Sequence, residues 1–228
     1  MKNNATHTAI LVFSRSAKEE AFSKRIDMLS KDLWHYEWYK KMISHTLSVA
    51  KESHMDVFFF DEACQRGTSF GERLSYAFSE LFRKGYTAVI SIGNDCPTLT
   101  TSDLIHAQSI LRKGKNVIGP TNKGGTYLIG MQASSFQLNS FAGLQWNSSA
   151  ICCELCNYLQ SIEVLSVKND INTSSDLYDF ISLGTHYLAK AFEKLIFGTL
   201  VVRFFASFIS FATHYFYNKP LRAPPVAL

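Results

Sequence analysis

The sequence predicts an α/β fold, with three layers around a mostly parallel sheet and an amphipathic helix added at the C-terminus. Short apolar runs suited to buried strands alternate with longer segments of helical spacing, which is typical of a parallel sheet covered by helices. Hydrophobic residues make up 46% of the 228 residues and charged residues 18%, enough for an independent core. We therefore expect one folded body with a short appendage.

The expected elements follow the chain in order. Short apolar runs predict strands at residues 9–13, 57–60, 88–92, 117–118, 127–131 and 163–167. Helical spacing predicts one helix or two within residues 18–51, and further helices at 70–83, 101–111, 148–160 and 173–183. Thr101 or Ser102 is expected to cap the helix that ends at 111, and Thr173 or Ser174 the last one, because hydroxyl side chains satisfy free amides there.

The formal net charge of +4 lies entirely in residues 186–228. That segment holds five basic residues against one acidic residue, whereas residues 1–185 hold 18 of each sign. A nucleic-acid groove needs clustered Lys and Arg on the folded body, so we expect no nucleic-acid partner.

The N-terminus is polar and lacks the hydrophobic core of a signal peptide. The chain has 5 Cys, an odd count, and three of them crowd into residues 152–156 without a matching pair of ligands elsewhere. We expect reduced thiols, no structural zinc, and a cytoplasmic protein that is soluble or peripheral to the inner face of a membrane.

Ligands of such sheets bind outside the carboxyl ends of the strands. The polar residues at those positions are Ser14 and Arg15, Asp61 and Glu62, Asn94 and Asp95, and Asp170 to Asn172. Neither G-x-G-x-x-G nor G-x-x-x-x-G-K-[ST] follows the first strand, which excludes the dinucleotide and P-loop fingerprints.

Three segments form an ordered pattern. They are Ile92-Gly93-Asn94-Asp95-Cys96-Pro97, Gly119-Pro120-Thr121-Asn122-Lys123-Gly124-Gly125-Thr126-Tyr127-Leu128-Ile129-Gly130 and Asp170-Ile171-Asn172-Thr173-Ser174-Ser175-Asp176-Leu177. The pattern resembles the bacterial glycosyltransferase-A-like family of nucleotide-diphospho-sugar transferases, with motifs G-S-D-C-P, G-P-x-x-D-G-G-Y-Y-L-I-G and D-I-D-T-x-x-D-L. Gly71-Glu72-Arg73-Leu74, Val12-Phe13-Ser14-Arg15 and Lys24-Arg25 look like its upstream segments. Phospholactate guanylyltransferases are similar more distantly.

This resemblance covers about residues 8–183 and implies a Rossmann-like glycosyltransferase-A fold that uses Mg²⁺ or Mn²⁺. We therefore expect a transferase domain at residues 1–183 and a tail at 184–228. The implied activity is transfer of a sugar from a nucleotide-sugar donor to an unidentified acceptor. Two alternatives remain: a nucleotidyltransferase using a nucleoside triphosphate and a phosphorylated acceptor, and a catalytically degenerate nucleotide-binding module.

Asp95 and Asp170 are the candidate metal ligands and catalytic residues, because hard carboxylate oxygens hold Mg²⁺ or Mn²⁺ and a metal neutralises a diphosphate. Asp95 could instead cap the helix that begins near Thr101, and Asp170 could simply form a turn before Thr173. Asp176 is expected to serve the helix macrodipole in a first turn.

The candidate nucleotide-binding residues comprise four cations, a glycine turn with its neighbours, and one tryptophan. They are Arg15, Lys24, Arg25, Arg73, Lys123, Gly124, Gly125, Thr126 and Trp146. The cations suit phosphate oxygens, and the two glycines permit close backbone approach to a ligand. Each has an alternative role. Lys24 and Arg25 could lie on a solvated helix face, and Arg73 could pair with Glu72 or Glu80. The two glycines could form a plain hairpin turn, and Trp146 could be a core residue.

Three positions depart from the family motifs. Lys123 and Asn172 each stand where the family has Asp, and Asn94 replaces a small Ser. The first two exchanges remove negative charge near the expected metal. The Lys123 ammonium could contact phosphate directly, or the change could weaken metal binding.

Residues 195–217 carry only one formal charge, Arg203, and residues 186–218 hold 7 of the 18 Phe. Thr199, Arg203, Ser207, Ser210 and His214 share one helical face, and an Arg at the centre of a lone membrane span is costly, roughly 2.5–3.5 kcal/mol. We expect an amphipathic helix that packs on its own domain, forms a homodimer, or lies on a membrane surface.

Overall fold

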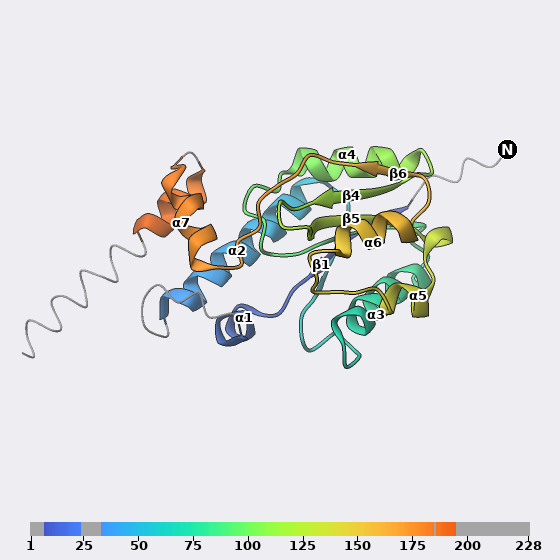
Figure 1. The fold of residues 1–228 in the computed structure, drawn as a ribbon, viewed down its shortest axis with the longest axis horizontal. Coiled ribbons are helices and arrows are strands. Elements are labelled where there is room, and N and C mark those ends of the chain that lie inside the picture. Colours follow the sequence, from blue (N-terminus) through green and yellow to red (C-terminus); the bar gives the residue numbers. More distant parts are fainter. Residues whose placement is uncertain (1–6, 24–32, 185, 195–228) are drawn as a thin grey trace, which may run out of the picture.

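A six-stranded sheet in the order β2-β1-β3-β5-β4-β6 forms the centre of the fold (Figure 1). The computed structural model describes residues 7–23, 33–184 and 186–194. The strands are β1 (Thr8–Phe13), β2 (Asp56–Phe60), β3 (Ala88–Ile92), β4 (Asn116–Pro120), β5 (Thr126–Gln132) and β6 (Ile162–Val164). Only β5 runs antiparallel to its neighbours, so the predicted mostly parallel α/β sheet is confirmed.

Helices cover both faces of this sheet (Figure 1). They are α1 (Ala17–Ser23), α2 (Leu33–Glu52), α3 (Phe70–Arg83), α4 (Thr101–Arg112), α5 (Leu138–Ala142), α6 (Ile151–Tyr158) and α7 (Ser174–Ser182), with a 3₁₀ turn at Ala133–Ser135. Within β1, Ile10 and Val12 join the core formed with α2 and α4, whereas Leu11 joins the core formed with α3, α5 and α6. Both faces of β1 are buried, which is why its sequence is continuously apolar.

The cap of α4 differs from the prediction. Thr100 is the N-cap, not Thr101 or Ser102, and its side chain accepts from the backbone N of Asp103. Asp103 in turn accepts from the Thr100 backbone N at 2.8 Å. A capping box needs its acidic residue three positions after the cap, and only Thr100 has that spacing to Asp103. For α7 the predicted cap Thr173 is confirmed, with Asp176 as its box partner.

Several predicted ends also shift. The last strand stops at Val164 and not at residue 167, although Lys168 still forms an isolated bridge with Thr121. The helix predicted at 148–160 is shorter, from Ile151 to Tyr158, and α5 was not predicted. All five cysteines are free thiols, as expected.

Residues 187–194, which the sequence places in the tail, are helical and pack on the body. Phe192 lies against Trp38 of α2, with ring centroids 3.6 Å apart, and Leu188 joins the same buried cluster. The division into residues 1–183 and 184–228 stays a prediction. The amphipathic helix expected at 195–217, with its membrane or dimer contact, lies outside the described residues.

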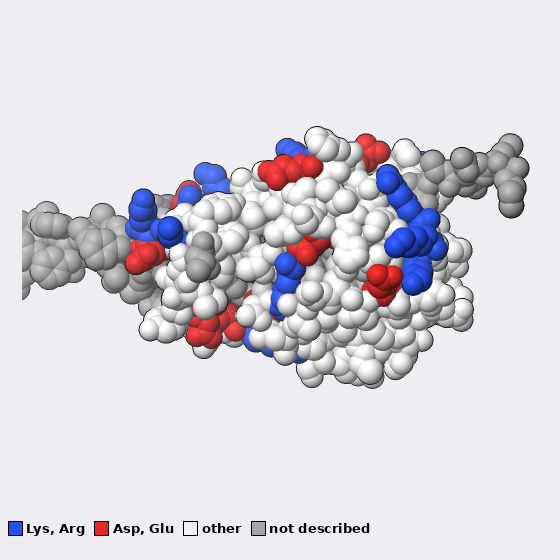
Figure 2. Space-filling model, turned by 90° about the horizontal axis from the view of Figure 1, so that it is seen from above, with Lys and Arg blue, Asp and Glu red and all other residues white. Residues whose placement is uncertain are grey.

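Charged side chains on the face seen in Figure 2 form small groups of both signs, separated by uncharged surface. Within the part of the chain that the structure describes, no helix combines the length and apolar character that crossing a membrane requires.

Two histidines, His45 of α2 and His186 after α7, lie where these two parts of the chain meet. His45 Nδ1 lies 2.7 Å from Tyr187 Oη, and its ring meets the His186 ring edge-on at 5.6 Å. Burial lowers the pKa of His45, as does the charge of His186, while the Pro97 and Leu99 carbonyls and Glu52 oppose this. Burial also lowers the pKa of His186. The unfolded chain therefore binds protons at a higher pH than the folded protein does.

We expect acidification below about pH 6.5, where free histidine titrates, to destabilise the protein. The linkage slope is at most about 1.4 kcal/mol per pH unit for each histidine. Thermal unfolding at pH 7.5 and 5.5 measures this, and His45→Gln should reduce the difference in midpoint. His106→Gln, at an exposed position of α4, is the matched control. An unaltered pH dependence in His45→Gln would contradict the assignment.

Candidate functional site

One cavity of about 410 Å³ opens at the sheet edge where β1 and β3 end and β5 begins. Because β5 is antiparallel, its start lies with the carboxyl ends of the parallel strands. The predicted site residues that line this cavity are Arg15, Arg73, Asp95, Gly125, Thr126, Trp146 and Asp170. Lys123 and Gly124 are not part of its wall, and Lys24 and Arg25 lie outside the described residues.

Asp95 and Asp170 come from two loops that are fastened together. The backbone N of Ile171, next to Asp170, donates to the carbonyl of Asp95 at 2.8 Å. Burial raises the pKa of Asp170, and the charge of Asp95 raises it further. The two carboxylates therefore share one region of the cavity wall. Since Thr100 caps α4, Asp95 does not have that structural role.

The donor chemistry at this position fits a divalent cation. Asp170 Oδ2 accepts from Asn172, whereas Asp170 Oδ1 is buried without a hydrogen-bond partner among the described residues. The described residues include no cluster of three His, Cys, Asp or Glu. Mg²⁺ commonly uses one or two carboxylates and takes its other oxygens from phosphates and water, so a pair of carboxylates is sufficient.

Two guanidinium groups face the same cavity. Arg15 is exposed directly after β1, and Arg73 belongs to the first turn of α3. Arg73 donates to the Thr68 carbonyl at 3.1 Å, which holds its side chain toward the loop before α3. Glu72 is engaged in the capping box of α3 through Ser69. Arg15 and Arg73 thus provide positive charge on the wall that also carries Asp95.

The two glycines of the β4–β5 turn have different surroundings. Gly124 has φ +80°, and a Cβ there would lie 1.9 Å from the carbonyl O of Ser149. Its close approach is therefore to the chain itself and not to a ligand. Gly125 lines the cavity, where a Cβ would lie 3.0 Å from Thr121 Oγ1.

Trp146 is both a packing residue and part of the cavity wall. Its Nε1 donates to the Phe141 carbonyl at 2.9 Å, and its ring lies 5.4 Å from that of Phe70. Gly71 makes room for the indole, since a Cβ there would lie 2.5 Å from Trp146 Cδ1. The cavity thus has an aromatic side as well as its charged one.

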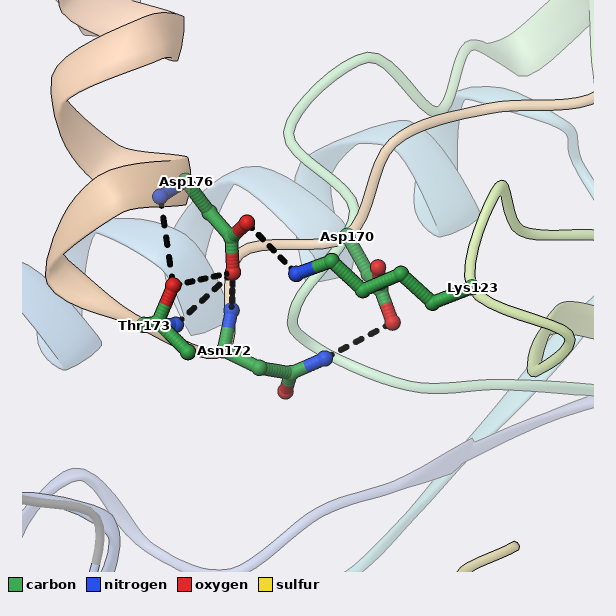
Figure 3. A network of polar contacts seen from close by, with 5 residues as sticks. All are labelled: Lys123, Asp170, Asn172, Thr173 and Asp176. Carbon is green, nitrogen blue, oxygen red and sulfur yellow. Dashed lines mark hydrogen bonds and ion pairs between the residues drawn. The ribbon is translucent and has the colours of Figure 1, made fainter. Parts of the chain in front are cut away.

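Lys123 and Asn172, the two residues that stand where the family motifs have Asp, each contact an aspartate (Figure 3). Lys123 forms an ion pair with Asp176, and the Asn172 side chain donates to Asp170 at 2.7 Å. Asp176 therefore does more than serve a helix dipole. Although burial acts in the opposite direction, the hydrogen bonds from Lys123 and Thr173 keep the pKa of Asp176 below its ordinary value.

Other polar residues also line the cavity, among them Asn94, Gln65 and Glu20. Asn94 is 5% exposed, and its Nδ2 has no hydrogen-bond partner among the described residues. Gln65 donates to the Ser14 and Phe60 carbonyls and so joins the ends of β1 and β2. Glu20 of α1 is buried beside Arg15, whose backbone N lies 3.4 Å from Glu20 Oε1. Asn94 had a signal in the sequence, because it lies two residues after the end of β3, whereas the position of Glu20 in α1 gave none.

Comparison with known proteins agrees with this architecture. The sequence profile of a family described as "Uncharacterized protein conserved in bacteria (DUF2064)" matches residues 46–148. This range includes Asp95 and the Gly124–Gly125 turn but not Asp170. No curated protein matches the chain significantly.

Among solved structures, a provisionally assigned nucleotide-diphospho-sugar transferase from Desulfovibrio desulfuricans G20 superposes with a TM-score of 0.71. It is 21% identical, and the match covers 84% of this chain and 97% of that one. This similarity confirms the predicted fold class.

Two other structures superpose less closely. A 4-diphosphocytidyl-2C-methyl-D-erythritol synthase from Anaerococcus prevotii DSM 20548 has a TM-score of 0.49, with 8% identity over 76% of this chain and 95% of that one. A manganese complex of Rv0371C from Mycobacterium tuberculosis H37Rv has a TM-score of 0.44, with 10% identity over 76% of this chain and 97% of that one.

Proposed function

We propose that this protein is a transferase that moves a sugar from a nucleoside diphospho-sugar to an acceptor, with Mg²⁺ or Mn²⁺ held by Asp95 and Asp170. One observation carries the proposal: the carboxylates of Asp95 and Asp170 line a single cavity at the carboxyl edge of the sheet together with two guanidinium groups, and Glu20 adds a third carboxylate. A carboxylate pair alone would repel a diphosphate. Carboxylates that hold a cation and are flanked by arginines instead form a site that suits a diphosphate.

The residues of the cavity would bind the diphosphate of the donor and stabilise it as the leaving group. A divalent cation bound there would supply positive charge against the diphosphate. Arg15 and Arg73 would donate charge-assisted hydrogen bonds to phosphate oxygens, which gain negative charge as the sugar departs. Asn94 Nδ2, which is buried in the wall with no acceptor among the described residues, would donate to an oxygen of the donor.

The aromatic side of the cavity could bind the nucleobase of the donor. Trp146 and Phe70 both line the cavity, and the Phe70 ring also meets Phe13 edge-on at 5.6 Å. Bases stack on such rings because every base has a π-face. No base for the acceptor hydroxyl is assigned, because Asp170, the candidate from the sequence, already holds the cation in this proposal.

Product analysis tests the proposal. The full chain is incubated with a panel of nucleotide sugars, Mn²⁺ and simple sugar or hydroxyl acceptors, and nucleotides are separated by anion-exchange chromatography. Release of a nucleoside diphosphate supports sugar transfer. Release of pyrophosphate from a nucleoside triphosphate would instead assign nucleotidyl transfer. Binding without either product would identify a non-catalytic nucleotide-binding module.

A further inference from the structure

Two chain segments, the turn that carries Lys123 and residues 170–176, meet in one polar network that includes Asp170 (Figure 3). Lys123, in the turn between β4 and β5, pairs through Nζ with Asp176 Oδ1 at the start of α7. Asp176 Oδ2 accepts from the backbone N of Asn172 at 3.0 Å and from that of Thr173 at 2.8 Å. Asn172 Nδ2 then donates to Asp170 Oδ2 at 2.7 Å. The network therefore runs without a break from the turn to the candidate metal ligand.

The network gives the two oxygens of Asp170 different roles. Oδ2 is occupied by the Asn172 amide, while Oδ1 is buried and has no hydrogen-bond partner among the described residues. A carboxylate held at one oxygen cannot rotate freely, so its other oxygen keeps a fixed direction. A buried oxygen without a protein donor needs another partner, and a cation is one that a carboxylate accepts.

Asn172 is itself held by Asp176. Its side chain is exposed, and a hydrogen bond from an exposed amide contributes little unless the residue carrying it is fixed. Here the Asn172 backbone N is bound to Asp176, whose carboxylate also closes the capping box of α7. Lys123 adds a contact to Asp176 from the turn between β4 and β5. Its side chain is 44% exposed and that of Asp176 only 16%, so the pair is partly sheltered from solvent.

We propose that Lys123, Asp176 and Asn172 form a positioning relay, which holds Asp170 so that Oδ1 is presented to the divalent cation. This inference rests on the proposed function, because it concerns the metal site of the same cavity. It explains why an amide and an ammonium stand at two positions where the family motifs have Asp. An amide can donate to Asp170, whereas a carboxylate at position 172 would repel it and Asp95.

The relay is tested by titrating Mn²⁺ into the metal-free full chain and counting free Mn²⁺ by electron paramagnetic resonance. Asn172→Ala should weaken Mn²⁺ affinity about 10–100-fold, the usual loss when a partner of a metal ligand is removed. Lys123→Met and Asp176→Asn should each weaken it severalfold. The double variant Lys123→Met/Asp176→Asn should bind Mn²⁺ about as weakly as the weaker-binding of the two single variants, because the two residues act as one unit. Lys115→Met is the matched control, since it removes an exposed ion pair with Glu163, outside the cavity wall.

Thermal unfolding without metal separates positioning from a general structural role. Asp176→Asn should lower the midpoint, since it weakens the capping box of α7. Asn172→Ala should leave the midpoint nearly unchanged while Mn²⁺ affinity falls. If Asn172→Ala lowers the unfolding midpoint of the metal-free protein as well as the Mn²⁺ affinity, Asn172 has a general structural role and the relay is overturned.

The relay and the proposed function fail in different ways. Normal Mn²⁺ affinity in Asn172→Ala, together with its loss in Asp170→Asn, overturns the relay and leaves the metal site intact. A wild-type protein that binds no Mn²⁺, even with a nucleoside diphosphate present, contradicts the proposed metal dependence and the relay with it.

Discussion

Asp95→Asn is expected to abolish the Mn²⁺-dependent binding of nucleoside diphosphates while leaving the protein folded. The residue lies in the loop after β3, lines the cavity, and is linked through its carbonyl to the loop of Asp170. The amide keeps the shape of the side chain and removes its negative charge, which is what attracts the cation. We expect at least a 100-fold loss of affinity in calorimetric titrations with uridine, cytidine, guanosine and adenosine diphosphates.

Asp179→Asn serves as the control for Asp95→Asn, because Asp179 is an exposed aspartate of α7 outside the cavity wall. It should bind like the wild type. An Asp95→Asn protein with unchanged Mn²⁺-dependent affinity would reject Asp95 as a metal ligand. Circular dichroism of each variant checks that a loss of binding does not reflect unfolding.

Arg15→Ala and Arg73→Ala are each expected to weaken nucleoside diphosphate binding about 10–100-fold. Hydrogen bonds to charged groups contribute roughly 1.5–3 kcal/mol, which corresponds to this range. Binding of the matching nucleoside, which has no phosphate, should change little. The same titrations with diphosphate and with nucleoside therefore show whether the arginines recognise the phosphates.

Arg83→Ala is the control on the same helix, since Arg83 lies in the last turn of α3, is exposed and pairs with Glu80. Its affinity should equal that of the wild type. An equal loss for nucleoside and diphosphate in the two cavity variants would place Arg15 and Arg73 in general support of the cavity. Unchanged diphosphate binding would remove both from the site.

The mostly parallel sheet could be predicted because its strands are short, apolar and separated by helical segments. β1 is buried on both faces, and its continuously apolar sequence indicates a buried strand but not its place in the strand order. Helix ends were harder to predict. Thr100, Thr101 and Ser102 are all able to cap, and only the position of Asp103 selects Thr100.

Part of the site could be predicted for a similar reason. Polar residues at the carboxyl ends of parallel strands meet at one edge, which brings Arg15, Asp95 and Asp170 to one cavity. Side-chain pairing between distant segments leaves no such pattern. Lys123 and Asp176 are far apart in the sequence, and nothing in the spacing of either motif indicates that they form an ion pair.

Glycine turns show the same limit. The Gly-Gly turn suggests a close ligand, but at Gly124 the neighbour is the Ser149 carbonyl, which belongs to the loop before α6. A positive φ and a crowded Cβ can be read from coordinates and not from residue type. Gly125, one position later, does face the cavity.

The central claim is that this cavity binds a nucleoside diphospho-sugar together with a divalent cation. Isothermal titration of the wild-type chain with a panel of nucleotide sugars, in Mn²⁺ and again in excess EDTA, tests it most directly. At least one nucleotide sugar should bind in Mn²⁺, with affinity at least tenfold weaker in EDTA. A folded protein that binds none of them under either condition would contradict the claim.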